Sequence, residues 1–452
     1  MPAERGRRLV AGWGNTAPTA ADVVAPQSRR ELADLLVTPP RRGLIARGLG
    51  RSYGDVAQNA GGVVADCTAL DRVVGFDGES GVVTVEGGAS IDTLLRTFVP
   101  LGWFVPVTPG TRYVTVAGCV ANDVHGKNHH VDGSFADHVV SLLLQLPDGE
   151  VVEIGPERRP DLYWATVGGL GLTGLIVEVT LRLLPVRTSL VRVDRERASD
   201  LDDLMARMAG GDHRYRYSVA WIDLLASGRA LGRAVLTRGD HAEPSDLPAR
   251  AARHPLAFSP RSPLPTPPVV PPHLLNRWSI KAFNELWFRK GNDRPEGLET
   301  IGAFFHPLDG VAAWNRLYGP QGFLQYQFVL PPGEEATLRA IVERLACERV
   351  ASFLAVLKRF GDGNAGLLSF PMKGWTLALD VPAGGSGLDA LLDQLDGVVA
   401  DAGGRVYLAK DARLAPELMP VMYPRLERWR QIRAEVDPAG ILMSDLARRL
   451  GL

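Results

Sequence analysis

The stretch Ala46-Arg-Gly-Leu-Gly-Arg-Ser-Tyr-Gly-Asp55 forms a glycine-rich loop between two short runs of strand-forming residues, 43–47 and 61–66. Its glycines allow backbone N–H groups to approach an anionic diphosphate closely, and Arg51 and Ser52 supply further hydrogen-bond donors. The spacing matches neither a P-loop nor the GxGxxG fingerprint, and no helix is predicted directly after the loop. A Rossmann fold is therefore excluded, and the loop remains a candidate phosphate site of another fold.

Two further glycine-rich segments follow, Pro109-Gly-Thr-Arg-Tyr-Val-Thr-Val-Ala-Gly-Cys-Val-Ala-Asn-Asp-Val-His-Gly-Lys-Asn-His-His130 and Ala165-Thr-Val-Gly-Gly-Leu-Gly-Leu-Thr-Gly174. Four of the nine histidines lie from His125 to His138, which raises the question of a metal site. We predict none, because Gly126 interrupts any helical i, i+4 presentation and no cysteine or paired carboxylate completes a ligand set. Three such loops separated by predicted strands are more typical of a cofactor site than of ordinary turns.

The composition describes a folded protein rather than a disordered tail or a nucleic-acid binder. The 452 residues are 46% hydrophobic and 22% charged, enough for two or three domains, and the formal charge is −1, so we expect no nucleic-acid partner. Six of the 50 basic residues are lysines, which makes a lysine inside a motif a candidate for chemistry. The three cysteines stand far apart, which predicts neither disulfides nor a zinc site.

The sequence predicts neither a signal peptide nor a transmembrane helix. The first residues, MPAERGRRLVAGWG, lack the apolar core of a secretory signal. No stretch approaches the roughly 20 apolar residues that span a bilayer. Any membrane contact is therefore expected to be peripheral.

The hydrophobic pattern predicts an α+β chain in three parts, 1–188, 189–404 and 405–452. In the first part a capping box at Ser28 predicts the start of a helix. Further strands are expected at 81–86, 139–146 and 175–183, and a second helix at 91–98. In the second part we expect one sheet flanked by helices, with strands at 214–222, 231–238, 322–330, 352–360 and 375–381 and helices at 335–348 and 388–402. Residues 254–272 hold eight prolines, which predicts an extended, mobile surface loop. The last part is expected to pack back onto the first.

The order of these motifs resembles the FAD-binding domain of the vanillyl-alcohol oxidase/p-cresol methylhydroxylase superfamily. More specifically, HGKNHH at 125–130, FLQYQF at 323–328, LSFP-x-x-GW at 368–375, YLAKDAR at 407–413 and SDLARRL at 444–450 are similar to the decaprenylphosphoryl-β-D-ribose 2′-oxidases, the flavin half of an actinobacterial arabinan-precursor epimerase. The resemblance runs from about Gly12 to Leu450. It implies a PCMH-type FAD-binding domain plus a substrate domain with an antiparallel sheet flanked by helices.

The resemblance also implies where FAD is held. The cofactor contacts carried over from the family are Gly48, Leu49, Gly50, Arg51, Ser52, Tyr53, Gly54, Asp55, Gly110, Thr115, Val116, Ala117, Gly118, Asn122, Asp123, Val124, His125, Ile176 and Tyr407. Some relatives bind FAD covalently through a histidine in the first loop. The corresponding residues here are Gly50-Arg51-Ser52-Tyr53, without a histidine, so we expect non-covalent FAD.

The family reaction is oxidation of the 2′-hydroxyl of a decaprenylphosphoryl ribose to the 2′-keto intermediate, and the motifs suggest residues for it. We expect Lys410, with Tyr53, to assist deprotonation of the hydroxyl, and His125 to lie at the isoalloxazine. A lysine acts as a base near neutrality only if its pKa is depressed, which burial beside a flavin provides. The alternative for Lys410 is a surface salt bridge with Asp411.

Strand periodicity groups the expected substrate contacts on sheet faces. The predicted set is Lys127, Trp221, Gln325, Gln327, Lys358, Phe360, Thr376 and Asp380. Lys127 and Lys358 are expected to hold the phosphate or the ribose. Close relatives carry Asn and Cys at the positions of Thr376 and Ala378, which changes the details of the pocket but not the redox step.

The resemblance further implies three partners: a polyprenyl-phosphate sugar, an NAD(P)H-dependent keto-reductase that completes the epimerisation for cell-wall arabinan, and a quinone or other electron acceptor. A lipid substrate calls for an apolar approach to the site from the plasma membrane. The sequence does not distinguish the cytoplasmic from the periplasmic face of that membrane. Apolar residues beside the proline-rich segment could form this approach, or they could belong to an ordinary hydrophobic core. They are Trp278, Phe283, Leu286, Trp287 and Phe288.

Two other functions remain open at the level of sequence. One is a flavin oxidase of the same fold that acts on a soluble sugar, alditol or aldonolactone. The other is a non-catalytic flavoprotein subunit, against which the presence of both Lys410 and His125 argues.

Overall fold

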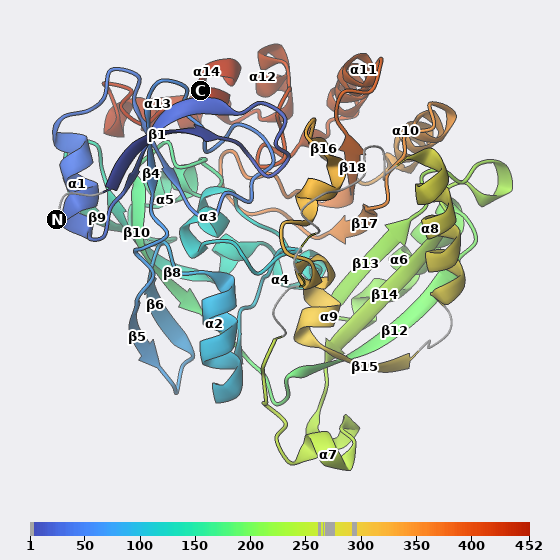
Figure 1. Cartoon of the computed structure of the whole chain (residues 1–452). Coiled ribbons are helices and arrows are strands. Elements are labelled where there is room, and N and C mark those ends of the chain that lie inside the picture. Colours follow the sequence, from blue (N-terminus) through green and yellow to red (C-terminus); the bar gives the residue numbers. More distant parts are fainter. Residues whose placement is uncertain (1–3, 261–263, 265, 267–275, 292–295) are drawn as a thin grey trace.

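The fold has two halves that meet along a central seam, with the N-terminal elements on one side and a large sheet on the other (Figure 1). The computed structural model describes residues 4–260, 264, 266, 276–291 and 296–452. Most of the predicted proline-rich loop, namely 261–263, 265 and 267–272, lies outside the described residues. Within the described ranges, no helix is long and apolar enough to cross a bilayer.

A four-stranded sheet carries the first glycine loop. Its order is β1 (Glu4–Val10), β2 (Thr19–Ala25), β4 (Val63–Asp66) and β3 (Leu44–Arg47), with β1 antiparallel to β2 and the other pairs parallel. Helix α1 (Arg29–Val37) begins at Ser28, whose side chain accepts from the Glu31 N–H as predicted, and it buries Leu32 and Leu36. The loop from Gly48 to Asp55 thus follows the carboxyl end of the parallel strand β3. In α/β sheets, ligand-binding loops commonly lie at such strand ends.

A five-stranded antiparallel sheet supports the second and third loops. Its order is β5 (Val73–Asp77), β6 (Val82–Glu86), β10 (Leu175–Arg182), β8 (Val139–Gln145) and β9 (Val151–Ile154). Helix α2 (Ile91–Phe98), capped by Ser90, buries its apolar face in the same core. The shorter elements of this half are the helical segments α3 (Val116–Ala121), α4 (His129–Asp132), η1 (Val99–Leu101), η2 (Phe135–His138) and α5 (Pro160–Thr166), and the strand pair β7 (Trp103–Phe104) and β11 (Leu184–Pro185).

An eight-stranded antiparallel sheet forms the other half. Its order is β15 (Glu296–Thr300), β12 (Leu190–Ala198), β14 (Ala234–His241), β13 (Tyr217–Ile222), β17 (Ala355–Phe360), β18 (Gly374–Pro382), β16 (Phe323–Leu330) and β19 (Arg405–Val406). The α+β class and the antiparallel sheet flanked by helices are confirmed. Strand β13 begins later than predicted, because 212–214 form a helical turn, and β14 is displaced to 234–241 by the turn at Gly232, whose φ is +66°.

Helices and turns complete this half. Its longer helices are α6 (Leu201–Gly211), α8 (Arg277–Lys290), α10 (Glu335–Cys347) and α11 (Leu388–Asp401), of which the last two match their predicted positions. The shorter ones are η3 (Asp212–Arg214), η4 (Gly228–Ala230), η5 (Pro244–Asp246), α7 (Ala249–Ala252), α9 (Ile301–Phe305), η6 (Pro307–Gly310) and η7 (Trp314–Tyr318). Helices α6 and α11 pack on the sheet, which leaves its other face toward the glycine loops.

The C-terminal segment crosses between the halves. After β19 the chain forms η8 (Pro416–Leu418), α12 (Met419–Met422), α13 (Leu426–Val436) and α14 (Asp445–Leu450), and the last helix lies beside the N-terminal sheet (Figure 1). There Leu442 forms a parallel bridge with Leu44, and the Asp445 carboxylate accepts from the Ala60 N–H. These contacts place the C-terminal segment against the N-terminal sheet, and the division at residues 188 and 404 stays a prediction.

Candidate active site

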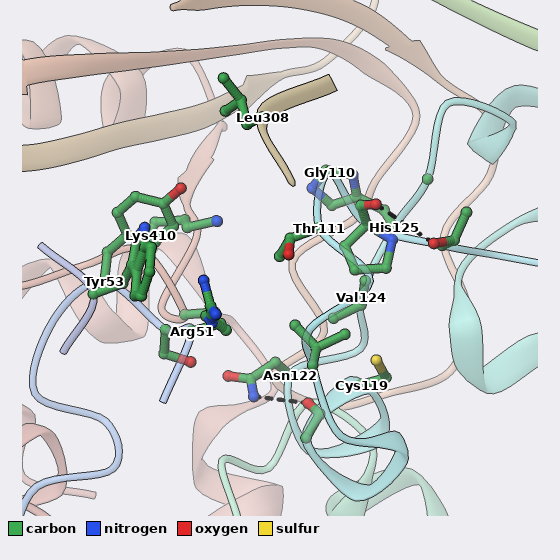
Figure 2. Close-up of a pocket in the computed structure, with 18 of the residues that line it drawn as sticks. Arg51, Tyr53, Gly110, Thr111, Cys119, Asn122, Val124, His125, Leu308 and Lys410 are labelled. Carbon is green, nitrogen blue, oxygen red and sulfur yellow. Dashed lines mark hydrogen bonds between the residues drawn. The ribbon is translucent and has the colours of Figure 1, made fainter. Parts of the chain in front are cut away.

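A cavity of about 1110 Å³ lies between the glycine loops and the free face of the eight-stranded sheet. Figure 2 shows Arg51, Tyr53 and Lys410 on one side of it and Val124 and His125 on the other. The first loop, the second loop and the segment after β19 are far apart in sequence, and the fold brings all three to this space.

Most residues predicted to hold the cofactor line this cavity. They are Gly48, Leu49, Gly50, Arg51, Ser52, Tyr53, Gly54, Gly110, Thr115, Ala117, Gly118, Asn122, Val124, His125, Ile176 and Tyr407. Three do not line it. Asp55 pairs with Arg449, Val116 is fully buried in the core, and Asp123 accepts from the hydroxyls of Ser134 and Ser369. These three therefore support the loops from behind.

Lys410 and Tyr53 lie against each other at the cavity wall. The Lys410 Nζ is 3.9 Å from the centroid of the Tyr53 ring. Burial lowers the pKa of Lys410 to about 7, against the opposing attraction of Asp380. Asp411 instead pairs with Arg449 at 2.8 Å, so the alternative of a surface salt bridge between Lys410 and Asp411 is wrong. Lys410 is thus a buried amine able to lose its proton near neutral pH.

His125 is held at the cavity by two polar side chains. Its Nε2 lies 2.9 Å from the Gln327 Nε2, and its Nδ1 lies 3.1 Å from the Lys358 Nζ. Burial, together with the nearby Lys358, lowers the pKa of His125 well below its usual value, so the imidazole is neutral. Burial, with the nearby Lys410 and Lys127, also lowers the pKa of Lys358 to about 7.

Five of the predicted substrate contacts line the cavity: Lys127, Trp221, Gln325, Gln327 and Lys358. The other three lie behind them. The Phe360 ring packs on His125 at 4.7 Å between centroids, Thr376 accepts from the Gln327 amide, and Asp380 accepts from Gln325. They share a sheet face with the lining residues, but long side chains from neighbouring segments cover them.

The sequence did not reveal the wall that the eight-stranded sheet gives to the cavity. Alternate residues of four strands point into it, mostly apolar: Val193, Arg195, Val219, Trp221, Val235, Thr237 and Val356. Strand β12 was not predicted at all, although Val191 and Val193 alternate with charged residues there and provide the signal. Trp13, Cys67, Cys119, Lys290 and Glu299 also line the cavity without having been predicted, and Trp287, one of the residues suggested for an apolar approach, lines it as well.

The histidines of the second loop diverge in the structure. His125 faces the cavity, His130 hydrogen-bonds the carbonyls of Asp212 and Tyr215, and His138 hydrogen-bonds the carbonyl of Asp132. Within the part of the chain that the structure describes, no three His, Cys, Asp or Glu side chains converge as metal ligands would.

The comparisons with known proteins agree with this geometry. The FAD binding domain family matches residues 20–155, and the D-arabinono-1,4-lactone oxidase family matches residues 385–450. The decaprenylphosphoryl-beta-D-ribose oxidase of Mycolicibacterium smegmatis is 42% identical over 451 residues, 99% of this chain and 98% of that protein. The chain belongs to the decaprenylphosphoryl-β-D-ribose oxidase family.

More distant relatives match less than half of the chain. The L-gulono-1,4-lactone dehydrogenase of Mycobacterium tuberculosis is 34% identical over 201 residues, 44% of this chain and 45% of that protein. The alditol oxidase of a Streptomyces strain is 32% identical over 179 residues, 39% of this chain and 42% of that protein. This member of the oxidase family is an FAD-dependent oxidoreductase that acts on a CH–OH group, with a PCMH-type domain and a substrate domain.

The residues of this oxidase fit FAD. Gly48 packs so closely on α3 that a Cβ there would lie 2.2 Å from the Thr115 hydroxyl oxygen, and Gly50 has a φ of +64°. The Arg51 guanidinium stacks 3.8 Å from the Trp13 centroid, and its Nε is buried without a protein partner. Asn122 also presents an unpartnered Oδ1, while its Nδ2 donates to the Gly118 carbonyl at 2.8 Å (Figure 2). The FAD diphosphate and the polar edge of its isoalloxazine ring would supply hydrogen-bond partners for these unpaired atoms of Arg51 and Asn122.

Proposed function

We propose that this oxidase converts the 2′-hydroxyl of decaprenylphosphoryl-β-D-ribose to the 2′-keto intermediate, the first half of epimerisation to the arabinose donor. The full-length relative named for that substrate supports the proposal. The observation that carries it is the charge of the cavity lining. The lining holds one carboxylate, that of Glu299, against seven basic side chains: Arg47, Arg51, Lys127, Arg195, Lys290, and Lys358 and Lys410, whose pKa values are lowered to about 7. A phosphorylated substrate suits that excess of positive charge better than a neutral sugar does.

The apolar sheet wall supplies the second requirement of a prenylated substrate. Val193, Val219 and Val235 project from adjacent strands β12, β13 and β14 and lead away from the loops. At the far end Leu298 and Trp287 continue the apolar lining, and Lys127 and Arg195 stand beside it. We assign the prenyl chain to this wall and the phosphate to the two cations.

The chemistry then divides between the cofactor and the protein. When bound, FAD would supply the acceptor for the hydride that leaves the carbinol carbon as the 2′-hydroxyl becomes a ketone. The neutral form of Lys410 takes the hydroxyl proton. Tyr53, whose hydroxyl stays protonated because burial raises its pKa well above the usual value, fixes the position of Lys410 and donates to the substrate oxygen. His125 and Gln327 orient the ribose. FAD is bound non-covalently, because the first loop offers no histidine.

Helix α8 suits a peripheral membrane contact. It exposes Trp278 and Leu286, at 66% and 68% of their surface, together with the cationic side chain of Lys281. Two other residues of the same helix, Trp287 and Lys290, line the cavity. An apolar, basic helix at the mouth of the cavity would receive a prenyl phosphate directly from an anionic bilayer.

The reaction requires two further partners. The 2′-keto product must be reduced to complete an epimerisation, which calls for an NAD(P)H-dependent keto-reductase. The oxidation also needs a quinone or another acceptor to take up the two electrons of each turnover.

Anaerobic flavin reduction tests the substrate. A decaprenylphosphoryl-ribose analogue is expected to bleach the flavin of the purified oxidase, while L-gulono-1,4-lactone and free alditols are not. Bleaching by the lactone or an alditol alone would instead establish the soluble-sugar oxidase. Bleaching by none of them would support the non-catalytic flavoprotein subunit. Acid precipitation of the same sample should release the flavin into the supernatant.

A further inference from the structure

Four side chains and a carbonyl form a continuous hydrogen-bonded chain beside the cavity. The Thr376 hydroxyl donates to the Phe328 carbonyl at 2.8 Å, and its oxygen lies 3.2 Å from the Gln327 Nε2. The same Nε2 lies 2.9 Å from the His125 Nε2. On the other side of the imidazole, Nδ1 lies 3.1 Å from the Lys358 Nζ. Thr376 is fully buried and Gln327 nearly so, so water does not compete for the bond between these two side chains.

The number of protons on each group sets the direction of every bond in the chain. The Thr376 hydroxyl has one proton and gives it to the Phe328 carbonyl, so toward Gln327 it can only accept. The Gln327 amide nitrogen therefore donates twice, to Thr376 and to the His125 Nε2. A neutral imidazole then carries its proton on Nδ1 and donates it to Lys358. Lys358 can accept only as a neutral amine with a free lone pair.

The charges around Lys358 favour the same state. Lys410, which follows β19, and Lys127, from the second loop, both act on it, and both are cationic when protonated. The groups that act on His125 are Lys358, Lys410, His129 from α4 and the backbone of Gly126, and none of them is a carboxylate. Burial and these neighbours together lower the pKa of Lys358 to about 7.

We propose that Thr376 is a positioning residue whose hydroxyl fixes the Gln327 amide, holds His125 as the Nδ1–H tautomer and keeps Lys358 neutral. The single lone pair of Lys358 is then occupied by His125. Lys410 is consequently the amine left to accept the hydroxyl proton, and no neighbouring ammonium opposes its protonation. The role of Lys410 rests on the proposed function, whereas the state of Lys358 does not.

Competitive labelling of the lysines tests this in the holoenzyme without any substrate. Trace acetylation across a pH series, resolved by peptide mass spectrometry, gives a midpoint for each of the six lysines. The exposed Lys373 and Lys281 serve as internal references. In the wild-type protein Lys358 is expected to reach half-reactivity well below these references.

Two variants of Thr376 separate the effect of its hydroxyl from the effect of its side-chain volume. In Thr376→Val the Gln327 amide is free to turn its oxygen to His125, so the midpoint of Lys358 should rise by about one pH unit and that of Lys410 should fall. Thr376→Ser keeps the hydroxyl and should retain both wild-type midpoints. Unchanged midpoints in Thr376→Val, or a wild-type Lys358 that titrates with Lys373, would overturn the proposal.

A measurement on the wild-type protein alone covers the case in which Thr376→Val fails to fold. The ¹⁵N shifts of the His125 ring distinguish a protonated from an unprotonated nitrogen, and His125→Gln identifies the signal. The proposal requires an unprotonated Nε2 at neutral pH. A proton found on Nε2 would contradict it, whatever the substrate of the enzyme proves to be.

Discussion

The Lys410 Nζ lies 3.9 Å from the centroid of the Tyr53 ring, and the Tyr53 N–H donates to the carbonyl of Ala409, the residue before Lys410, at 3.0 Å. One backbone bond and one cation–π contact thus join the first glycine loop to the segment that carries the proposed base. The proposed proton acceptor and the first glycine loop are positioned as one unit.

Lys410→Ala should retain the flavin spectrum and lose turnover by about 10²- to 10⁴-fold, because it removes the proton acceptor without touching the glycine loops. Stopped-flow reduction of the flavin under anaerobic conditions measures the effect. Lys373→Ala, which removes an exposed lysine paired with Asp362, is the matched control and should reduce the flavin at the wild-type rate. Near-normal bleaching in Lys410→Ala would refute the assignment.

The rate of flavin reduction should rise with pH through a midpoint near 7. The pKa of Lys410 is lowered to about 7, so its neutral, proton-accepting form increases as pH rises and falls about tenfold for each unit below the midpoint. Single-turnover reduction between pH 5 and 9 measures this limb. A rate that is flat across neutrality would show that another group accepts the proton.

Arg449→Ala should lower the free energy of unfolding by about 3 kcal/mol, because it strands two carboxylates in poorly solvated positions. Arg449 donates to Asp55 at 2.9 Å and to Asp411 at 2.8 Å, on either side of the cofactor loop. Urea denaturation followed by fluorescence measures the change. Arg187→Ala, which breaks an exposed pair with Glu243, should change stability by less than about 0.5 kcal/mol.

The double variant Trp278→Ala/Leu286→Ala should bind anionic phospholipid vesicles about tenfold more weakly than the wild type, since it removes the exposed apolar face of α8. Vesicle co-sedimentation measures binding, and reduction of the flavin by a short-chain, soluble analogue should be unaffected. Val421→Ala removes an exposed apolar side chain from α12 and serves as the control. Equal vesicle binding by all three proteins would exclude α8 as the membrane contact.

The glycine loops and Lys410 could be predicted because their chemistry is local. Close approach of backbone and a positive φ, as at Gly50, require glycine and so leave a visible pattern in the sequence. The long alternating strands β10, β16 and β18 were equally visible, since period-2 patterning is a local property. These two kinds of signal account for the fold class and for most of the cofactor site.

The remaining features of the fold and of the site depend on contacts between strands, which the periodicity of a single strand does not predict. Periodicity places Thr376 and Asp380 on the cavity face of β18, but it cannot show that Gln327 and Gln325 of the neighbouring strand cover them. Strand β1 was missed because its sequence, ERGRRLV, is largely charged and takes its strand structure from pairing with β2. Its state is set by a partner rather than by its own composition.

The clamp formed by Arg449 has a consequence for how the protein is made. Asp55 belongs to the first glycine loop, the proposed site of the cofactor diphosphate, yet the arginine that holds it stands 394 residues later in the chain. During synthesis the ribosome must translate that whole interval before the loop can take its final form. We therefore expect cofactor loading to be a late event in the life of the nascent chain, and a stalled or truncated chain that lacks Arg449 should emerge colourless.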